Sequence, residues 1–153
     1  MTIRTATVED VEGIVGLTNR AFAVERVFLD RDRIDGGSVR ESLENGTFLV
    51  GENSHGSLVA SVYLEQRGNR GYFSLLAVDP THQRSGLGRR MVDAVESHLR
   101  FLGCHALDMR VINLRAELMP FYRRLDFVEV GVEPFEDPSL RRPAHFILMS
   151  KSL

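Results

Sequence analysis

A chain of 153 residues has the usual size of one domain, and such a domain buries roughly two-thirds of the surface of its unfolded chain. A hydrophobic share of 43% and a charged share of 26% exclude a disordered chain and a fibrous one. Nineteen basic against twenty-one acidic residues give a net charge of −2, which excludes an overall electrostatic attraction to nucleic acid or to an anionic membrane.

Cysteine content and apolar segments narrow the class further. The single cysteine, Cys104, cannot form an internal disulfide. The N-terminus has no apolar segment typical of a signal peptide, and no apolar run reaches the roughly 18 residues that a membrane-spanning helix needs. We therefore predict a cytoplasmic protein whose single domain spans residues 1–153, with neither nucleic acid nor a membrane as its partner.

The N-terminal part of the chain shows a strand pattern and then a helix pattern. Residues 2–6 alternate in polarity, as a short strand does. Thr7 with Asp10 is typical of a helix N-cap, and apolar residues at helical spacing follow through residues 8–22. A charged stretch over residues 25–37 has no clear period.

A short helix and a hairpin come next. Ser38 with Glu41 predicts the capping box of a helix that Asn45–Gly46 would end. Residues 47–52 and 58–65 predict two strands joined by a tight turn.

The second half of the chain contains the strongest helix pattern. Residues 72–78 form an apolar run typical of a central strand. Residues 87–102 place their apolar side chains on one face of a helix. The remaining patterns predict a strand at 106–112, a helix at 114–125, and strands at 127–132 and 145–149.

The predicted order is therefore β-α-α-β-β-β-α-β-α-β-β, which defines an α/β chain with a mixed (α+β) sheet. Strands joined by tight turns before the long helix should be antiparallel. The strand–helix–strand unit over residues 72–112 should form a right-handed parallel crossover. We expect helices packed on this mixed sheet.

The loop at residues 83–88, Gln-Arg-Ser-Gly-Leu-Gly, leads from a buried strand into the long helix. Glycine lets the backbone approach a ligand closely, and the first amides of a helix attract anions such as a phosphate or pyrophosphate. Arg84 and Arg89 flank the loop. A tight turn is the alternative explanation of the two glycines. Met91 stands where a dinucleotide-binding fingerprint needs a third glycine, and no Gly-Lys-Ser/Thr of a P-loop is present.

Two segments together resemble the GNAT superfamily of N-acetyltransferases. The first matches the family signature Gln/Arg-x-x-Gly-x-Gly/Ala, which follows a strand ending in Val-x-Pro: Gln83, Gly86 and Gly88 are in register with it. The second, Asn113-x-x-Ala followed by Tyr122-x-x-x-Asp-Phe, is similar to the family's Asn-x-x-Ala and Tyr-x-x-x-Gly-Phe. The predicted element order also fits the family from end to end.

The second segment departs from the family pattern at two points. The stretch between Ala116 and Tyr122 is about two residues longer, and it contains Pro120, which we expect to kink the predicted helix. Asp126 replaces the usual glycine, and Asp tolerates the left-handed conformation better than most residues.

The resemblance implies a single GNAT-like domain in which a substrate amine attacks the thioester of acetyl-CoA directly. It implies that backbone groups of residues 76–78 hold the pantetheine arm, with the Val78 amide polarising the thioester carbonyl. Amides of residues 84–89 would hold the pyrophosphate, and Asn113 would bond the pantetheine arm or a water. The implied acetyl-CoA site comprises Leu76, Ala77, Val78, Gln83, Arg84, Ser85, Gly86, Leu87, Gly88, Arg89 and Asn113.

The resemblance also implies the catalytic side chains. Tyr122 would protonate the departing thiolate; its alternative is a role as an amphipathic core residue. A general base is needed because an alkylamine is mostly protonated at neutral pH. Asp108 stands five residues before Asn113, where some family members carry a glutamate that acts as the base, and Glu65 is the competing candidate. For either carboxylate the alternative is a solvated strand residue.

The acceptor is the least determined part of the interpretation. We expect it between the aperiodic segments 25–37 and 133–143, as a small molecule, a peptide N-terminus or a lysine side chain. Acidic residues of both segments could attract a cationic amine, but interspersed arginines leave the sign of the field open. The five histidines have no metal-ligand spacing, so no metal is expected, and a homodimer stays open.

Three functions remain for the structure to weigh. The leading one is an acetyl-CoA-dependent N-acetyltransferase. The others are a non-catalytic CoA-binding sensor or regulatory module of the same fold, and a nucleotide-binding protein that uses the same anion site.

Overall fold

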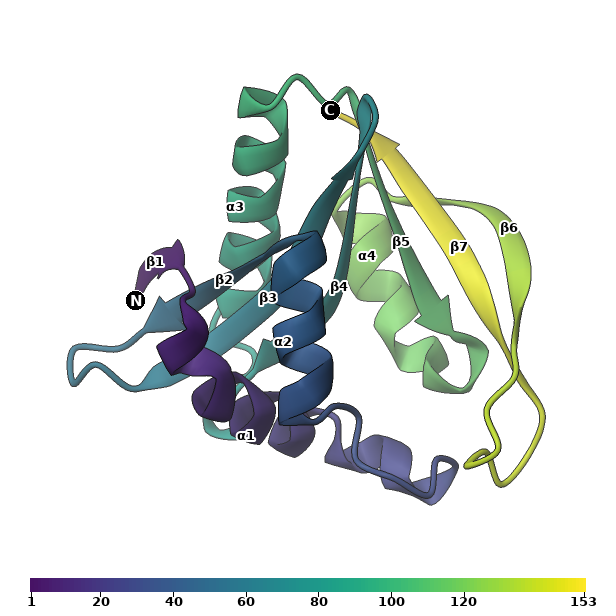
Figure 1. Cartoon of the computed structure of the whole chain (residues 1–153). Coiled ribbons are helices and arrows are strands. Elements are labelled where there is room, and N and C mark those ends of the chain that lie inside the picture. The colour runs from purple at the N-terminus through teal and green to yellow at the C-terminus, as the bar shows by residue number, and fades with distance from the viewer.

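Seven strands form one mixed sheet in the computed structural model, which describes residues 1–153 (Figure 1). Their order across the sheet is β1-β2-β3-β4-β5-β7-β6, and every neighbouring pair is antiparallel except β4 and β5. The strands are β1 Thr2–Thr5, β2 Thr47–Glu52, β3 Leu58–Arg67, β4 Arg70–Val78, β5 Ala106–Ile112, β6 Val128–Phe135 and β7 Ala144–Ser152.

Four α-helices cover the two faces of this sheet. They are α1 Val11–Ala21, α2 Gly36–Asn45, α3 Leu87–Phe101 and α4 Met119–Arg124. Helices α1 and α2 pack on one face, where Ile14, Val39 and Phe48 belong to one buried cluster. Helices α3 and α4 pack on the other, where Met91 and Tyr122 join the largest buried cluster. None of the helices is both long and apolar enough to cross a membrane.

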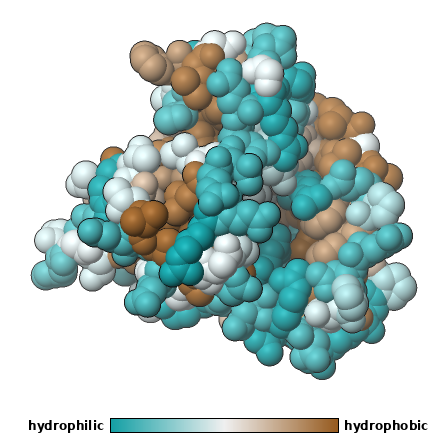
Figure 2. Space-filling model, viewed as in Figure 1, coloured by the Kyte–Doolittle hydropathy of each residue, from teal (hydrophilic) through white to brown (hydrophobic).

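No helix covers the β5–β7–β6 part of the sheet on the face that Figure 1 presents. Figure 2 shows hydrophobic side chains gathered on this side of the molecule, whereas the surface over α2 is largely hydrophilic. The edge strand β6 adds the exposed Val128, Val130 and Val132.

The predicted mixed sheet and most of its elements are confirmed. The strands predicted at 47–52 and 106–112 have the predicted bounds, and the long helix ends one residue earlier than predicted. Thr7 and Asp10 form a capping box, in front of a 3₁₀ turn that leads into α1. The capping box predicted at Ser38 and Glu41 is wrong. Asp35 is the N-cap, its carboxylate accepts from the Ser38 amide at 2.8 Å, and α2 begins at Gly36.

The single helix predicted at 114–125 is also wrong. A 3₁₀ helix, Asn113–Leu118, comes first, and α4 begins only at Met119. Pro120 lies in the first turn of α4, where its missing N–H removes no intrahelical hydrogen bond, so it starts a helix instead of kinking one. Asp126 has a φ of 72°, so it takes the left-handed conformation of the glycine it replaces.

The centre of the sheet opens between β4 and β5. The two strands pair only where Arg70–Tyr72 lie beside Ala106–Asp108, and then they separate (Figure 1). Leu75 has a φ of 56°, and the register between β3 and β4 shifts at this point, which defines a bulge. A bulge bends its strand, and it lies on the part of β4 that diverges from β5.

Candidate active site

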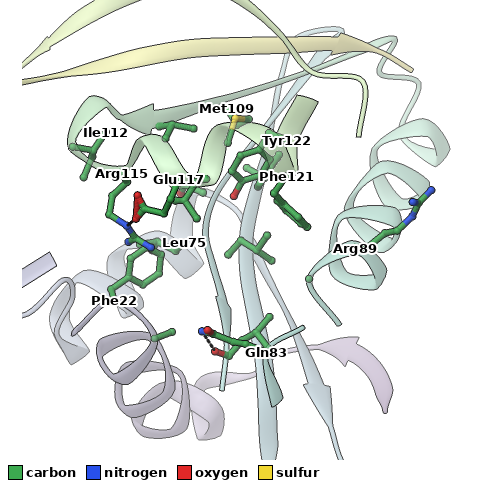
Figure 3. Close-up of a pocket in the computed structure, with 18 of the residues that line it drawn as sticks. Phe22, Leu75, Gln83, Arg89, Met109, Ile112, Arg115, Glu117, Phe121 and Tyr122 are labelled. Atoms are coloured by element: carbon green, nitrogen blue, oxygen red, sulfur yellow. Dashed lines mark hydrogen bonds and ion pairs between the residues drawn. The ribbon is translucent and has the colours of Figure 1, made fainter. Parts of the chain in front are cut away.

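A cavity of about 740 Å³ lies between the diverging ends of β4 and β5. The start of α3 and the loop before it form one wall. The 3₁₀ helix Asn113–Leu118 and α4 form a second, and the end of α1 with the segment after it forms a third. Figure 3 shows Arg89 on the α3 side of this cavity and Arg115 with Phe22 on the opposite side.

The loop before α3 exposes backbone amides to the cavity. Arg84 and Gly86 both have left-handed φ values, of 67° and 81°, and α3 begins immediately afterwards at Leu87. Gly86 is the N-cap and has no side chain to cap the first amides. The Gln83 side chain donates to the Val78 carbonyl at 3.2 Å and ties the loop to the strand end. Uncapped amides at the start of a 15-residue helix are suited to bind an anion.

Cationic side chains reinforce this anion site. Arg84, Arg89 and Arg124 line the cavity, and none of the three makes an ion pair with the protein. In the whole cavity lining, six arginines and His82 face two glutamates. The net charge of −2 for the chain therefore conceals a cavity of positive potential.

Most of the residues predicted to hold acetyl-CoA line this cavity. They are Leu76, Val78, Gln83, Arg84, Gly86, Leu87, Gly88 and Arg89. Three others do not. Ala77 is buried in the sheet opposite Ser61, and the Ser85 hydroxyl donates to the His82 carbonyl. The Asn113 side chain accepts from the His145 amide at 2.8 Å, which fastens the end of β5 to β7.

Tyr122 lies in the cavity wall among three phenylalanines. Its ring centroid is 5.0 Å from that of Phe121, 6.0 Å from that of Phe127 and 6.3 Å from that of Phe73. Its hydroxyl makes no hydrogen bond with the protein and remains accessible from the cavity (Figure 3). Burial raises the pKa of Tyr122 to about 12, so the phenol keeps its proton at neutral pH. Tyr122 is thus part of the core, and its protonated hydroxyl borders the cavity.

The structure does not bring the two predicted bases to the cavity. Asp108 lies at the paired end of β5, where Arg70 donates to both of its oxygens at 2.8 and 2.7 Å. That bond holds the pKa of Asp108 below its usual value. Glu65 accepts from the Tyr63 hydroxyl at 2.5 Å and from Arg67. Burial opposes ionisation of Glu65, but these two bonds outweigh it and lower its pKa.

Both carboxylates are cross-strand neighbours of Tyr72, which lines the cavity: Tyr72 pairs with Glu65 on β3 and with Asp108 on β5. Directly opposite residues project from the same face of a sheet, so the two carboxylates share the face of Tyr72. Neither of them belongs to the cavity lining itself. That one of them acts as the base stays a prediction; in this structure both carboxylates bind arginines and lie outside the cavity lining.

Four other charged residues line the cavity opposite the anion site. Glu25 is only 3% exposed, and it accepts from Arg33 at 2.6 Å and from Arg115 at 2.8 Å. Arg115 also donates to Glu117 at 2.7 Å. The Arg33 guanidinium lies 4.9 Å above the centre of the Phe22 ring. Arg115 and Glu117 are not among the residues predicted from the sequence, although their place just after Asn113 in the second motif was a signal.

The two segments expected to flank the acceptor do lie together. The Asp30 amide donates to the Ser139 carbonyl at 2.8 Å, and the Arg141 amide donates to the Phe28 carbonyl at 2.8 Å. Most of their acidic residues bind arginines, among them in the ion pairs Asp30–Arg141, Asp32–Arg26 and Asp137–Arg31. These pairs weaken the acidic field that could attract a cationic amine there. No cluster of His, Cys, Asp and Glu suited to a metal is present.

The chain belongs to the acetyltransferase (GNAT) family, whose sequence profile matches residues 15–127. Among curated proteins, it is 26% identical over 131 residues to a mycothiol acetyltransferase of Propionibacterium freudenreichii subsp. shermanii, covering 82% of this chain and 42% of that protein. It is 33% identical over 76 residues to glucosamine 6-phosphate N-acetyltransferase 1 of Oryza sativa subsp. japonica, covering 50% of this chain and 44% of that protein. The chain thus spans less than half the length of these relatives.

Solved structures share the whole fold. The ribosomal-protein-S18-alanine N-acetyltransferase of Escherichia coli superposes with a TM-score of 0.82 at 20% identity, over 99% of this chain and 92% of that one. The acetyltransferase YncA of Salmonella typhimurium, solved with acetyl-CoA, superposes with a TM-score of 0.76 at 23% identity, over 100% of this chain and 94% of that one. At such identities the likeness concerns the fold.

Proposed function

We propose that this protein is an acetyl-CoA-dependent N-acetyltransferase that moves an acetyl group to an amine by direct attack. The observation that carries the proposal is the cavity between β4 and β5. It combines uncapped amides at the start of α3 and unpaired arginines on one side with the protonated Tyr122 in its wall. Family membership and the acetyl-CoA found in YncA support the choice of donor.

The residues present fit acetyl-CoA. Its pyrophosphate carries negative charge, which the amides of residues 84–89 and the side chains of Arg84, Arg89 and Arg124 would bind. Its pantetheine arm would lie along the free edge that β4 offers where it leaves β5, beside Leu76 and Val78. Beyond Tyr72, β4 pairs with no strand on its β5 side, so this edge is free.

The reaction is the exchange of a thioester for an amide. The amine nitrogen attacks the thioester carbonyl carbon, a C–N bond forms and the C–S bond breaks. The thiolate takes one proton and the amine loses one, so the proton balance closes. Tyr122 stays protonated up to about pH 12 and can donate its hydrogen to the departing sulfur.

The proton of the acceptor ammonium must leave by another route. Glu25 and Glu117 are the two carboxylates of the cavity, and Glu25 uses both oxygens in ion pairs. The Glu117 side chain is 61% exposed and borders solvent. We therefore propose deprotonation through water at the Glu117 side of the cavity, and not by direct contact with Asp108 or Glu65.

The names of similar proteins do not identify the acceptor of this chain. The relatives are named after a small thiol compound, a sugar phosphate and the alanine of a ribosomal protein, so they do not agree on one acceptor. What they share is acetyl transfer.

The test measures binding and turnover separately. Calorimetric titration should show that acetyl-CoA binds, and thiol release with a panel of amines should show turnover. Binding of acetyl-CoA without any thiol release would instead favour the CoA-binding sensor. Equal binding of ATP or NAD would favour the nucleotide-binding protein.

A further inference from the structure

The chemical class of the acceptor amine can be inferred from the cavity, provided that the proposed function holds. Its starting point is a group of buried charges that faces the cavity opposite the anion site of α3 (Figure 3). Glu25 lies between two guanidinium groups, with Oε1 bound to Arg33 at 2.6 Å and Oε2 bound to Arg115 at 2.8 Å. The three residues come from separate segments, after α1, before α2 and after β5. We call them the Arg33–Glu25–Arg115 triad.

The two guanidinium groups and one carboxylate of the triad leave one positive charge unbalanced. The side chains of Arg33 and Arg115 are 22% and 12% exposed, and a single carboxylate lies between them. Burying two cations beside one anion is costly unless a further anion can balance them. Glu117 also lines the cavity and binds Arg115 at 2.7 Å, but its side chain is 61% exposed, so water screens its charge more than that of the buried Glu25.

The triad also holds unused hydrogen-bond donors. Arg33 uses only Nη1, so its Nε and Nη2 groups donate to no protein acceptor. Arg115 uses Nε and Nη1, which leaves Nη2 free. Because Glu25 fixes both guanidinium groups, and Arg33 is further held over the Phe22 ring, these donors have set positions. Fixed planar guanidinium groups are suited to bind carboxylate or phosphate oxygens.

The positive surroundings suit the chemistry of the amine as well. Neighbouring cations disfavour the ammonium form and so lower the pKa of a bound amine. This leaves more of the neutral amine that attacks the thioester. A purely cationic acceptor, such as a polyamine, would gain nothing from such a site.

We propose that the acceptor is a small amine that carries an oxyanion, a carboxylate or a phosphate, which the Arg33–Glu25–Arg115 triad binds. Arg33 and Arg115 are the groups that contact the oxyanion, and Glu25 is the positioning residue that orients them. The attacking nitrogen belongs to the same molecule, so the triad selects the acceptor by charge.

The experiment compares matched pairs of acceptors by thiol release from acetyl-CoA. Each of several α-amino acids is paired with its carboxamide, and O-phosphoethanolamine is paired with ethanolamine. The proposal expects kcat/KM to be at least about tenfold higher for the anionic member of one type of pair. The type of pair that shows the preference distinguishes a carboxylate from a phosphate.

Variants then assign the preference to the triad. In Arg115→Gln and in Arg33→Gln the preference should fall about tenfold, mainly through KM, while the Kd of acetyl-CoA stays unchanged. Arg115→Lys keeps the charge without the planar fork and should recover part of the preference. Arg26→Gln is the matched control, because it removes an exposed arginine of the same segment that pairs with Asp32 outside the cavity. Thermal midpoints of all variants show whether each one is folded.

Two results would overturn the proposal. One is a kcat/KM for the neutral members that equals or exceeds that for the anionic members in every pair. The other is a preference that survives in Arg115→Gln and Arg33→Gln. If no amine is acetylated, calorimetry distinguishes the two proposals. Titration with acetyl-CoA tests the proposed function. The absence of heat from millimolar amino acids and from millimolar O-phosphoethanolamine overturns the proposed acceptor site.

Discussion

Tyr122 shows how one residue can belong to the core and to the site. Its ring contacts phenylalanines and its hydroxyl reaches the cavity. In Tyr122→Phe we expect kcat to fall by about 10²- to 10⁴-fold, because the proton donor for the thiolate is lost, while the Kd of acetyl-CoA changes little. Parallel thiol-release and calorimetric measurements check this. Unchanged turnover would remove Tyr122 from the mechanism.

The raised pKa of Tyr122 also predicts a pH dependence. The acid form is present at every pH below about 12 and is lost only as the pH rises through that value. Between pH 7 and pH 10, ionisation of Tyr122 should therefore cause no decline in kcat/KM. Any decline seen in this range should persist in Tyr122→Phe. A decline near pH 9 that disappears in the variant would contradict the burial argument.

Asp108 provides a second prediction at this scale. Asp108→Asn should leave kcat/KM within about twofold of wild type, because the carboxylate binds Arg70 outside the cavity. Arg70 lowers the pKa of Asp108 in the folded protein. The ion pair therefore stabilises the fold at any pH above the pKa that Asp108 has in the unfolded chain. This stabilisation is lost as the pH falls through the lower pKa of the folded protein. The pair is partly exposed and is worth less than about 1 kcal/mol. A large loss of turnover in Asp108→Asn would restore it as the base.

The sequence motifs contain the glycine loop and Tyr122, which line one cavity, but they do not indicate the other charged residues of that cavity. Gln83, Gly86 and Gly88 occur within six residues, so a local motif contains them. The bond between Arg115 and Glu25 joins residues 90 positions apart, and no local pattern indicates it. The pairing of Asp108 with Arg70 joins two neighbouring strands, which the sequence does not show, whereas Glu65 binds Arg67 two residues away on the same strand.

The turn into α3 is the element that prepares the anion site. Gly86 and Gly56 both have left-handed φ values, 81° and 76°, and an added Cβ would meet nothing within 4 Å at either one. Gly86→Ala and Gly56→Ala should each lower the free energy of unfolding by about 1 kcal/mol. Only Gly86→Ala should weaken acetyl-CoA binding, because Gly56 lies in the β2–β3 turn away from the cavity. Equal acetyl-CoA affinity in both variants would place the cofactor elsewhere.

Element boundaries were predictable where one pattern dominated. Strand β5 and helix α3 have a single strong period and tight turns around them, and their predicted bounds were right or nearly so. The division of segment 113–125 into a 3₁₀ helix and an α-helix was not predictable, because the two kinds of helix have similar apolar spacing. At α2, Asp35 could serve as N-cap as well as Ser38, and only the structure decides between them.

One buried ion pair connects the sheet to both helices on its α3 face. Lys151 of β7 binds Glu96 of α3 at 3.1 Å and the Leu125 carbonyl after α4 at 2.8 Å. Lys151→Met should lower the free energy of unfolding by about 3 kcal/mol, because Glu96 then keeps only the longer bond to Arg100. Denaturant unfolding measures this. Lys151→Met combined with Glu96→Leu should recover much of the loss, and an unchanged single variant would show that the pair is not structural.

At the scale of the whole molecule, the diverging strands separate two charged regions across one cavity. The start of α3, with Arg89, lies on one side, and the Arg33–Glu25–Arg115 triad lies on the other, with Tyr122 between them (Figure 3). A donor with a polyanionic end and an acceptor with an oxyanion would therefore meet at the centre from opposite sides.

The most direct test of this account is thiol release from acetyl-CoA with an amine that carries a carboxylate or a phosphate, in wild type beside Tyr122→Phe. We predict amine-dependent thiol release by the wild type, with the N-acetylated amine as product, and a loss of at least about a hundredfold in Tyr122→Phe. No release by the wild type with any amine, or equal release by the variant, would contradict it.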